Sequence, residues 1–178
     1  MNIYAEIFKA FNGAKIDYLI VGGVAVNLYG YNRFTGDIDI LLALDKNNLG
    51  KMEKLMHKMG YSPRLPVEIH ELQDTAKLKG WIKEKGLKAY TFINKKRPQL
   101  DIDILVEESL VFEKQFKKRA KIKVWDMQLP VISLKKRSLP DKDYLKRCKY
   151  SSPESKLEWL ASAVEFAFAK KRRITQTN

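Results

Sequence analysis

The chain has little of the residues from which disulfides and zinc sites are built. It contains one cysteine, Cys148, and two histidines, His57 and His70, among 178 residues. One cysteine excludes an intrachain disulfide, and two scattered histidines argue against a zinc site. No apolar run approaches the ~20 residues needed to span a bilayer, so we expect no membrane partner. Because residues 1–14 also lack a signal-peptide pattern, we expect a cytoplasmic location.

Acidic residues are the scarcer charged class. The sequence has 34 Lys and Arg against 21 Asp and Glu, a formal net charge of +13. Between residues 114 and 149, thirteen basic residues stand against three acidic ones, an excess of ten. Such a surface attracts polyanions and therefore favours a nucleic acid or a nucleoside triphosphate as partner. A solvated surface that only maintains solubility explains the same composition.

The length and the apolar pattern predict one core domain with a helical extension. We expect the core to span residues 1–133 and a C-terminal helical section, packed on the core, to span residues 134–178. The predicted helices cover residues 3–14, 24–31, 46–59, 72–85 and 110–119, with a final helix that begins near Ser152. The predicted strands cover residues 16–21, 37–44, 88–93, 100–106, 122–125 and 129–132.

Two short segments carry the strongest signal. The pair Gly22-Gly23 ends an apolar run, and Gly36, thirteen residues after Gly23, opens a segment in which Asp37 and Asp39 alternate with isoleucines. Alternation with a period of two predicts a strand with both carboxylates on one face. A glycine pair at a strand end lets backbone N–H groups approach a phosphate closely.

A second strand, residues 100–105, repeats this alternation with Asp101 and Asp103. If the two strands are neighbours in one sheet, three or four carboxylates converge. Several carboxylates at one point repel one another unless a cation lies between them, and hard divalent cations prefer oxygen ligands. The pattern therefore predicts a site for one or two Mg²⁺ ions, which can hold the oxygens of a phosphoryl displacement.

With these motifs together, the chain resembles the nucleotidyltransferase superfamily with the polymerase-β-like fold. The sharp matches are the glycine pair, the Asp37/Asp39 motif and a third carboxylate, for which Asp103 is the better candidate and Asp101 the alternative. The stretch from Gly22 to Ile40 is further similar to the minimal and AbiEii-type nucleotidyltransferases of prokaryotes, which often belong to toxin–antitoxin or abortive-infection systems. The residues that carry this further similarity are Ala25, Tyr29, Gly30, Arg33 and Thr35.

The resemblance implies an α/β (or α+β) fold, a mixed twisted sheet flanked by helices. It implies Mg²⁺-dependent transfer of a nucleoside monophosphate from an NTP to an acceptor hydroxyl. Asp37, Asp39 and Asp103 would be catalytic and would hold the metal, with Asp103 helping to deprotonate the acceptor. The nucleotide-binding residues implied are Gly22, Gly23, Arg33, Thr35 and Lys136, of which Arg33 would neutralise the leaving pyrophosphate.

The acceptor stays open at this point. The basic C-terminal region favours RNA, for instance a tRNA end, whereas a protein acceptor or a cognate toxin or antitoxin partner would fit the related systems. The chain departs from AbiEii-type proteins in being shorter, and Lys136 and Asp143 match their later motif only at loose spacing. A non-catalytic module of the same fold that binds RNA or a partner protein is the alternative function.

Overall fold

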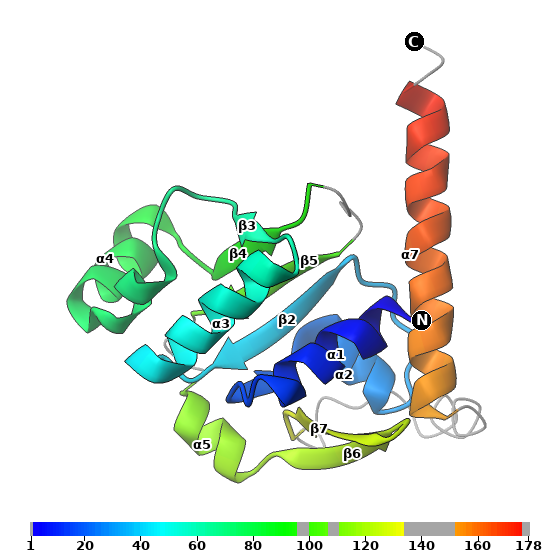
Figure 1. Ribbon diagram of the computed structural model, residues 1–178, viewed down its shortest axis with the longest axis horizontal. Coiled ribbons are helices and arrows are strands. Elements are labelled where there is room, and N and C mark those ends of the chain that lie inside the picture. The colour runs from blue at the N-terminus through cyan, green and yellow to red at the C-terminus, as the bar shows by residue number, and fades with distance from the viewer. Residues whose placement is uncertain (1, 96–99, 107–110, 134–151, 176–178) are drawn as a thin grey trace.

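The computed structural model describes residues 2–95, 100–106, 111–133 and 152–175, with side chains described up to residue 165. A mixed sheet forms the centre of the molecule, and six α-helices of the described residues flank it (Figure 1). This arrangement confirms the expected α/β class with a mixed sheet and helices. None of the helices in the described part of the chain combines the length and apolar character needed to cross a membrane.

The elements follow the predicted order closely. The helices are α1 (Ile3–Gly13), α2 (Gly22–Leu28), α3 (Lys46–Lys58), α4 (Thr75–Lys85), α5 (Phe112–Lys117) and α7 (Pro153–Thr175), with a 3-10 helix η1 (Ile69–Gln73) before α4. The strands are β1 (Tyr18–Ile20), β2 (Asp37–Leu42), β3 (Ser62–Pro63), β4 (Ala89–Ile93), β5 (Asp101–Leu105), β6 (Ala120–Val124) and β7 (Met127–Val131).

The seven strands lie in the order β3-β4-β5-β2-β1-β7-β6. Strands β2 and β5 are parallel neighbours, as are β1 and β7, and the other adjacent pairs are antiparallel. In the β2–β5 pair, Asp37 lies opposite Asp101 and Asp39 lies opposite Asp103. The topology therefore places the two aspartate-bearing strands side by side at the centre of the sheet.

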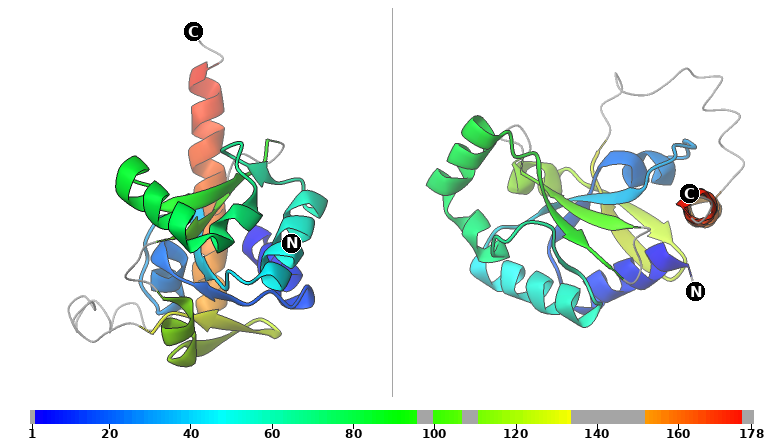
Figure 2. Two further views of the ribbon diagram at one scale, coloured as in Figure 1. Left: turned by 90° about the vertical axis from the view of Figure 1, so that its left-hand side faces the viewer. Right: turned by 90° about the horizontal axis from the view of Figure 1, so that it is seen from above.

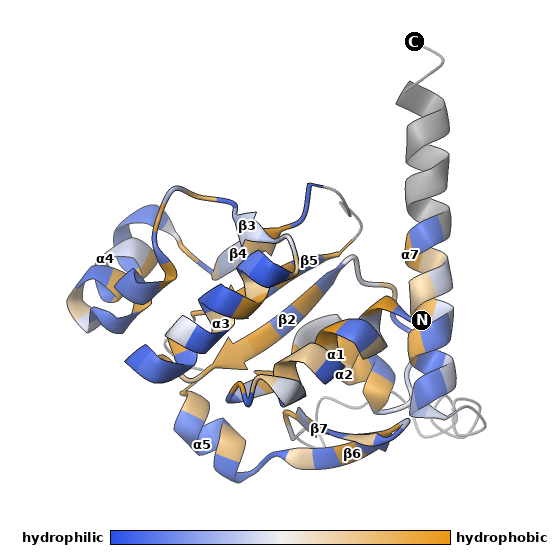
Figure 3. Ribbon diagram, in the orientation of Figure 1, coloured by the Kyte–Doolittle hydropathy of each residue, from blue (hydrophilic) through white to orange (hydrophobic). Residues whose placement is uncertain are grey.

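The two faces of the sheet are covered unequally. Helices α1 and α3 lie along one side of it (Figure 2), and their apolar residues pack against Ile38 and Ile40 of β2 in the main core. On the other face, Phe112 and Phe116 of α5 pack against a small cluster around Leu41. Strand β2 alternates between half-buried and buried residues at its start and is fully buried at its end. Figure 3 shows the hydropathy of the same strand, which is hydrophobic at its end. The start of β2 is thus where polar side chains of this second face stay accessible.

The C-terminal helix α7 is fastened to the body at its N-terminal half. Leu157 and Leu160 are fully buried, and the Asn2 side-chain amide donates a hydrogen bond to the Leu157 carbonyl at 3.2 Å. The Glu154 carboxylate accepts a bond from the Trp125 N–H at 2.6 Å. Beyond these contacts the helix extends past the sheet (Figure 1).

Three boundaries differ from the sequence expectation. Helix α2 begins at Gly22 and ends at Leu28, so the glycine pair is the first turn of the helix rather than a turn before it. The predicted helix over 72–85 is divided, because Asp74 caps a new helix at Thr75 with bonds to the N–H groups of residues 76 and 77. Trp125 is not part of a strand; it occupies the β6–β7 turn with a φ of 51°.

Candidate metal and nucleotide site

Three carboxylates meet at the start of β2 and β5. Asp37, Asp39 and Asp103 each offer an oxygen, and these atoms lie within 4.8 Å of one another. All three side chains are half-buried on the face of the sheet that α1 and α3 leave open. The strand alternation produces this directly, because residues two apart on β2 share a face and the parallel register brings Asp103 beside Asp39.

Asp101, the fourth carboxylate on these strands, has a different surrounding. Its Oδ2 accepts a bond from Arg64 Nη2 at 2.5 Å, and it does not belong to the cluster of the other three. Burial raises the pKa of Asp101 above its usual value, and the Arg64 guanidinium opposes this rise. Of the two candidates for the third carboxylate, the geometry therefore favours Asp103.

The electrostatics of the cluster are those of crowded like charges. Burial raises the pKa of Asp39 to about 6, and the charges of Asp37 and Asp103 add to the rise. The Gly23 N–H, which bonds to the carboxylate, and the Arg33 charge act in the opposite direction. A cation between the three groups would offset the charges of Asp37 and Asp103 that raise the pKa of Asp39.

The glycine pair is required by its approach to the carboxylates. Gly22 has a φ of 61°, and a Cβ built there would lie 1.8 Å from Asp39 Oδ2. A Cβ on Gly23 would lie 2.5 Å from the Cβ of Thr35. Neither position accepts a side chain without movement of the site, so the fold itself explains both glycines before any phosphate is considered.

The loop between α2 and β2, residues 29–36, is held by buried side chains. Asn27 is fully buried, and its amide donates to the carbonyls of Gly23 at 2.9 Å and Arg33 at 2.5 Å. Its Oδ1 accepts the Arg33 N–H at 3.3 Å. At the end of the loop the buried Thr35 hydroxyl donates to Asp37 Oδ1. The loop thus fixes the first carboxylate of the cluster.

Of the remaining predicted residues, the structure describes the positions of some and not of others. Arg33 is exposed at the rim of the cluster, close enough for its charge to lower the pKa of Asp39. Lys136 and Asp143 lie outside the described residues, as does Cys148. The nucleotide-binding roles of Gly22, Gly23, Arg33 and Thr35 stay predictions.

The cluster fits a hard divalent cation. It offers three carboxylates, which suit Mg²⁺ or a similar ion. Asp103 Oδ1 is buried and has no hydrogen-bond partner within the described parts of the chain, although buried polar atoms are nearly always bonded. A metal at this point would satisfy that atom and neutralise its neighbours, so Asp37, Asp39 and Asp103 are the residues that would hold it.

Sequence reasoning missed Asn27, Arg64 and Lys156. Asn27 stands among the apolar residues of a short helix, which is a readable sign of a buried polar role. Lys156 precedes Leu160 and Val164 at a spacing of four, so it falls on the apolar stripe of α7. Arg64 gives no such signal, because its partner Asp101 is 37 residues away along the chain.

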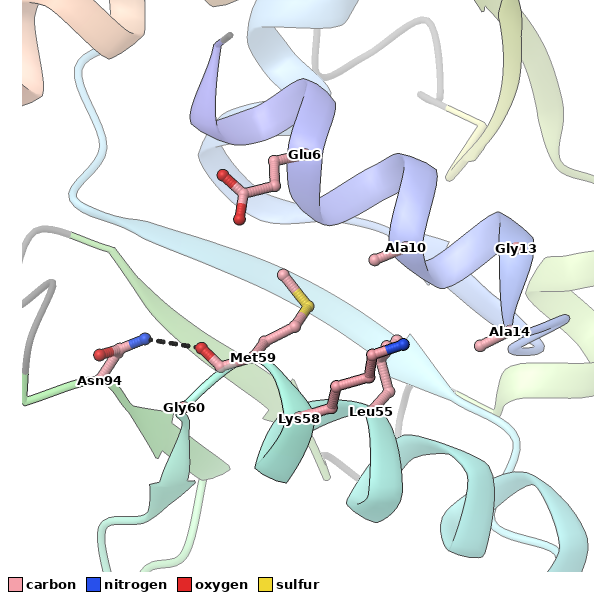
Figure 4. Close-up of a pocket in the computed structure, with 9 residues that line it drawn as sticks. All are labelled: Glu6, Ala10, Gly13, Ala14, Leu55, Lys58, Met59, Gly60 and Asn94. Atoms are coloured by element: carbon pink, nitrogen blue, oxygen red, sulfur yellow. Dashed lines mark hydrogen bonds between the residues drawn. The ribbon is translucent and has the colours of Figure 1, made fainter.

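A separate groove lies between α1 and α3 and has a volume of about 750 Å³ (Figure 4). It is lined by small residues of α1 such as Ala10 and Gly13, by Leu55 and Met59 of α3, and by Asn94 after β4. None of the three clustered aspartates lines it. The predicted chemistry and this groove therefore belong to different places in the fold.

Comparisons with known proteins add a distant structural likeness. No protein-family model matches the chain, and no curated protein shows significant similarity to it. Among solved structures, the chain is similar to the lincomycin-bound crystal structure of the lincosamide antibiotic adenylyltransferase LnuA. The two share 16% identity over 88% of this chain and 95% of that one, with a TM-score of 0.46. At this distance, substrate and acceptor have to be inferred from the site itself.

Proposed function

We propose that the chain is a nucleotidyltransferase, an enzyme that moves a nucleoside monophosphate from an NTP to an acceptor hydroxyl. The observation that carries the proposal is the convergence of Asp37, Asp39 and Asp103 from two parallel neighbouring strands. Carboxylates gathered in this way suit Mg²⁺, which commonly binds one or two carboxylates together with substrate phosphates. The glycine pair beside them and the resemblance of both motifs to the nucleotidyltransferase superfamily support the same activity.

The proposed reaction is a single displacement at phosphorus. The acceptor oxygen forms a bond to the α-phosphorus, the bond from that phosphorus to the bridging oxygen breaks, and pyrophosphate leaves with the electron pair. The hydroxyl proton passes to a base, for which Asp103 is the candidate that the resemblance implies. When bound, Mg²⁺ would supply positive charge at the phosphate oxygens.

The other site residues have positioning and neutralising roles in this proposal. Arg33, exposed at the rim, would balance the charge that develops on the leaving pyrophosphate. The Gly22-Gly23 turn leaves room for the nucleotide phosphates, since neither residue carries a side chain over the carboxylates. Thr35 would act on the nucleotide site through Asp37, to which its hydroxyl is bonded. Lys136 keeps its predicted role without a described position.

The acceptor we propose is RNA, for instance a tRNA end, with a protein as the competing acceptor. The net charge of +13 and the exposed lysines of β6 favour a polyanion. A cytoplasmic toxin–antitoxin or abortive-infection setting, with a cognate partner protein, follows from the resemblance. The division into a core of residues 1–133 and a C-terminal section of 134–178 likewise remains a prediction, supported by the packing of α7 on the body.

The test is a labelling experiment with purified protein. Each α-labelled NTP is incubated with Mg²⁺ and a mixture of cellular RNA and protein, and the macromolecule that acquires label is identified. The matched control is Asp39→Asn, which keeps the size of the side chain and removes its charge; we expect it to fold and to transfer nothing. Absence of label on every macromolecule, combined with no Mg²⁺-dependent NTP binding in calorimetry, would replace the enzyme by the non-catalytic RNA- or protein-binding module.

A further inference from the structure

We propose that Lys156 and Arg33 form a binding site for the terminal phosphates of the NTP, at which the Asn32 amide occupies the lysine while no ligand is bound. This inference deepens the proposed function and rests on it. The first observation is that a charged side chain is buried on helix α7, which is far along the chain from the three aspartates. Lys156 lies on α7 and is 4% exposed.

The ammonium of Lys156 is incompletely satisfied. Its Nζ donates one hydrogen bond, to Asn32 Oδ1 at 2.5 Å, whereas an ammonium has three donors. The accepting group is a neutral amide. Within the described ranges, which end for side chains at residue 165, Lys156 forms no ion pair. Lysine is rarely buried without an anionic partner, because a desolvated charge is costly, and an anionic ligand would supply the partner that the described residues lack.

The helix fixes where this charge lies. Leu157 and Leu160 are fully buried, and the bond from Asn2 to the Leu157 carbonyl ties this turn of α7 to the start of α1. Because the backbone around Lys156 is held on more than one side, the lysine is kept beside Asn32 of the α2–β2 loop. It is a preorganised cation, which is the arrangement that favours binding of an anion.

The Lys156 contact leads directly toward the carboxylate cluster. Asn32 belongs to the loop whose next residue, Arg33, is close enough for its charge to act on Asp39. Three residues beyond Asn32, the Thr35 hydroxyl bonds to Asp37. Helix α7 also packs against α2, which begins at the glycine pair. An NTP with its reacting phosphate at the carboxylates would extend its remaining phosphates toward a side of the site that carries Arg33 and Lys156.

The ligand class follows from the groups available. Arg33 is exposed and Asn32 is exposed, so a phosphate can approach the loop from solvent and replace the Asn32 amide at the lysine. A terminal phosphate offers several charged oxygens, which suit an ammonium that lacks acceptors. Arg33 and Lys156 would then bind neighbouring phosphates of one polyphosphate.

A purely structural role for Lys156 makes a different prediction. In that case the lysine would only fasten the loop to α7 through Asn32, and its removal would lower stability. For an anion site, Lys156→Met keeps the apolar stem and removes a buried charge, so the free protein should be as stable as the original or more stable. Stability and ligand affinity therefore move in opposite directions only if Lys156 is a ligand-binding residue.

The experiment uses inorganic tripolyphosphate as a probe that is independent of the base. Its dissociation constant is measured by calorimetry in the presence of Mg²⁺ for the original protein, Lys156→Met and Lys54→Met. Lys54 is an exposed lysine of α3 and serves as the charge-matched control. We expect Lys156→Met to weaken binding about tenfold or more, as the loss of a charge-assisted hydrogen bond implies, and Lys54→Met to change it less than about twofold. Equal affinities in all three proteins, or no tripolyphosphate binding by the original protein, would overturn the proposal.

Asn32→Ala completes the design, because it removes the one hydrogen bond described for the Lys156 ammonium and leaves the charge in place. If Lys156 is an anion-binding residue, Asn32→Ala should bind tripolyphosphate as tightly as the original protein or more tightly. If Lys156 only holds the loop, Asn32→Ala and Lys156→Met should lower the melting temperature by similar amounts, and that result would contradict the proposal. The labelling experiment separates the two levels of inference. If the original protein transfers label but Lys156→Met binds tripolyphosphate normally, the proposed enzyme activity is supported and the Lys156 site is rejected. If the original protein transfers no label but Lys156→Met binds tripolyphosphate more weakly than it does, the Lys156 site is supported and the enzyme activity is rejected.

Discussion

Strands β2 and β5 begin with the same five residues, Asp-Ile-Asp-Ile-Leu, and lie side by side in parallel register. Their isoleucines enter the same core, yet their aspartates have different partners. On β2, Asp37 accepts the Thr35 hydroxyl and Asp39 accepts the Gly23 N–H. On β5, Asp101 is paired with Arg64, and Asp103 Oδ1 has no partner in the described residues.

The comparison shows that the sequence of a strand determines which face a carboxylate occupies, whereas segments elsewhere in the chain determine its role. The loop before β2 and the first turn of α2 orient two aspartates toward a common point. The segment after β3 supplies an arginine that removes one aspartate of β5 from the cluster. One site of three carboxylates, rather than four, results from two identical strands.

The largest expected effect comes from replacing the two aspartates of β5 one at a time. We expect Asp103→Asn to lower the proposed transfer by about 10²- to 10⁴-fold, because it would remove both a proposed metal ligand and the proposed base. The same change at Asp101 should lower transfer only a few-fold, since Arg64 already neutralises that group. Steady-state rates of the two variants check this, and equal losses would place Asp101 within the site.

A second prediction concerns the glycine that approaches β2. Gly22→Ala puts a methyl group where Asp39 Oδ2 lies and forces a residue with a side chain to adopt a positive φ. We expect the affinity for Mn²⁺, measured by its paramagnetic signal, to fall about tenfold or more, and stability to fall by about 1–3 kcal/mol. Gly36→Ala is the matched control, because a Cβ at Gly36 meets nothing within 4 Å. Normal Mn²⁺ binding in Gly22→Ala would show that Asp39 is not a ligand.

A third prediction tests the hydroxyl that orients Asp37. Thr35→Val preserves the shape of the side chain but removes the donor, whereas Thr35→Ser preserves the donor. Outer groups that orient metal-holding residues commonly contribute 10- to 100-fold to metal affinity, so we expect a loss of about tenfold in Mn²⁺ affinity for the valine variant. The serine variant should stay within a few-fold of the original protein. If both variants lose affinity alike, packing against Gly23 rather than the hydrogen bond is what matters.

The sequence was sufficient for six of the seven strands, for the shared face of the aspartates and for the candidate ligands, because alternation with a period of two is a local property. The two-residue strand β3 is too short to show such a pattern. The repeated aspartates predicted a cluster only on the condition that β2 and β5 are neighbours, and that condition depends on the sheet order, which is not local. Arg64 and Lys156 reach their partners across 37 and 124 residues of chain, so no local pattern reveals those pairings. The buried position of Lys156 was readable from its place on the stripe of α7, but its neighbour Asn32 was not.

The first turn of α2 and the β6–β7 turn show a second limit of prediction from the sequence, which concerns the cause of a local backbone conformation. The glycine pair predicted close backbone approach, and the structure supplies a reason for it within the protein itself, the contacts with Asp39 and Thr35. Trp125 takes a positive φ although glycine and asparagine are the usual residues for such turns. Its N–H bond to Glu154 helps to hold that conformation, and this contact comes from a helix that begins 28 residues later.

The smallest expected effect concerns the pH dependence of stability without metal. Folding raises the pKa of Asp39 to about 6, whereas in the unfolded chain it is ~3.9. Between these values the folded protein binds more protons than the unfolded chain, so the contribution of Asp39 to stability is lost as the pH rises from about 4 to 6. Asp39→Asn has no carboxylate at this position, so its stability does not decrease in this way as the pH rises. In a chelating buffer near pH 7 it should melt a few degrees above the original protein.

The same pair of proteins separates this effect from other titrations. Near pH 4 the two melting temperatures should converge, because Asp39 is then protonated in the folded protein and carries no charge to repel its neighbours. Addition of Mg²⁺ near pH 7 should raise the melting temperature of the original protein more than that of Asp39→Asn, since only the folded protein presents the cluster. A constant difference at both pH values, with or without Mg²⁺, would mean that neither burial nor the two neighbouring aspartates raise the pKa of Asp39 in solution.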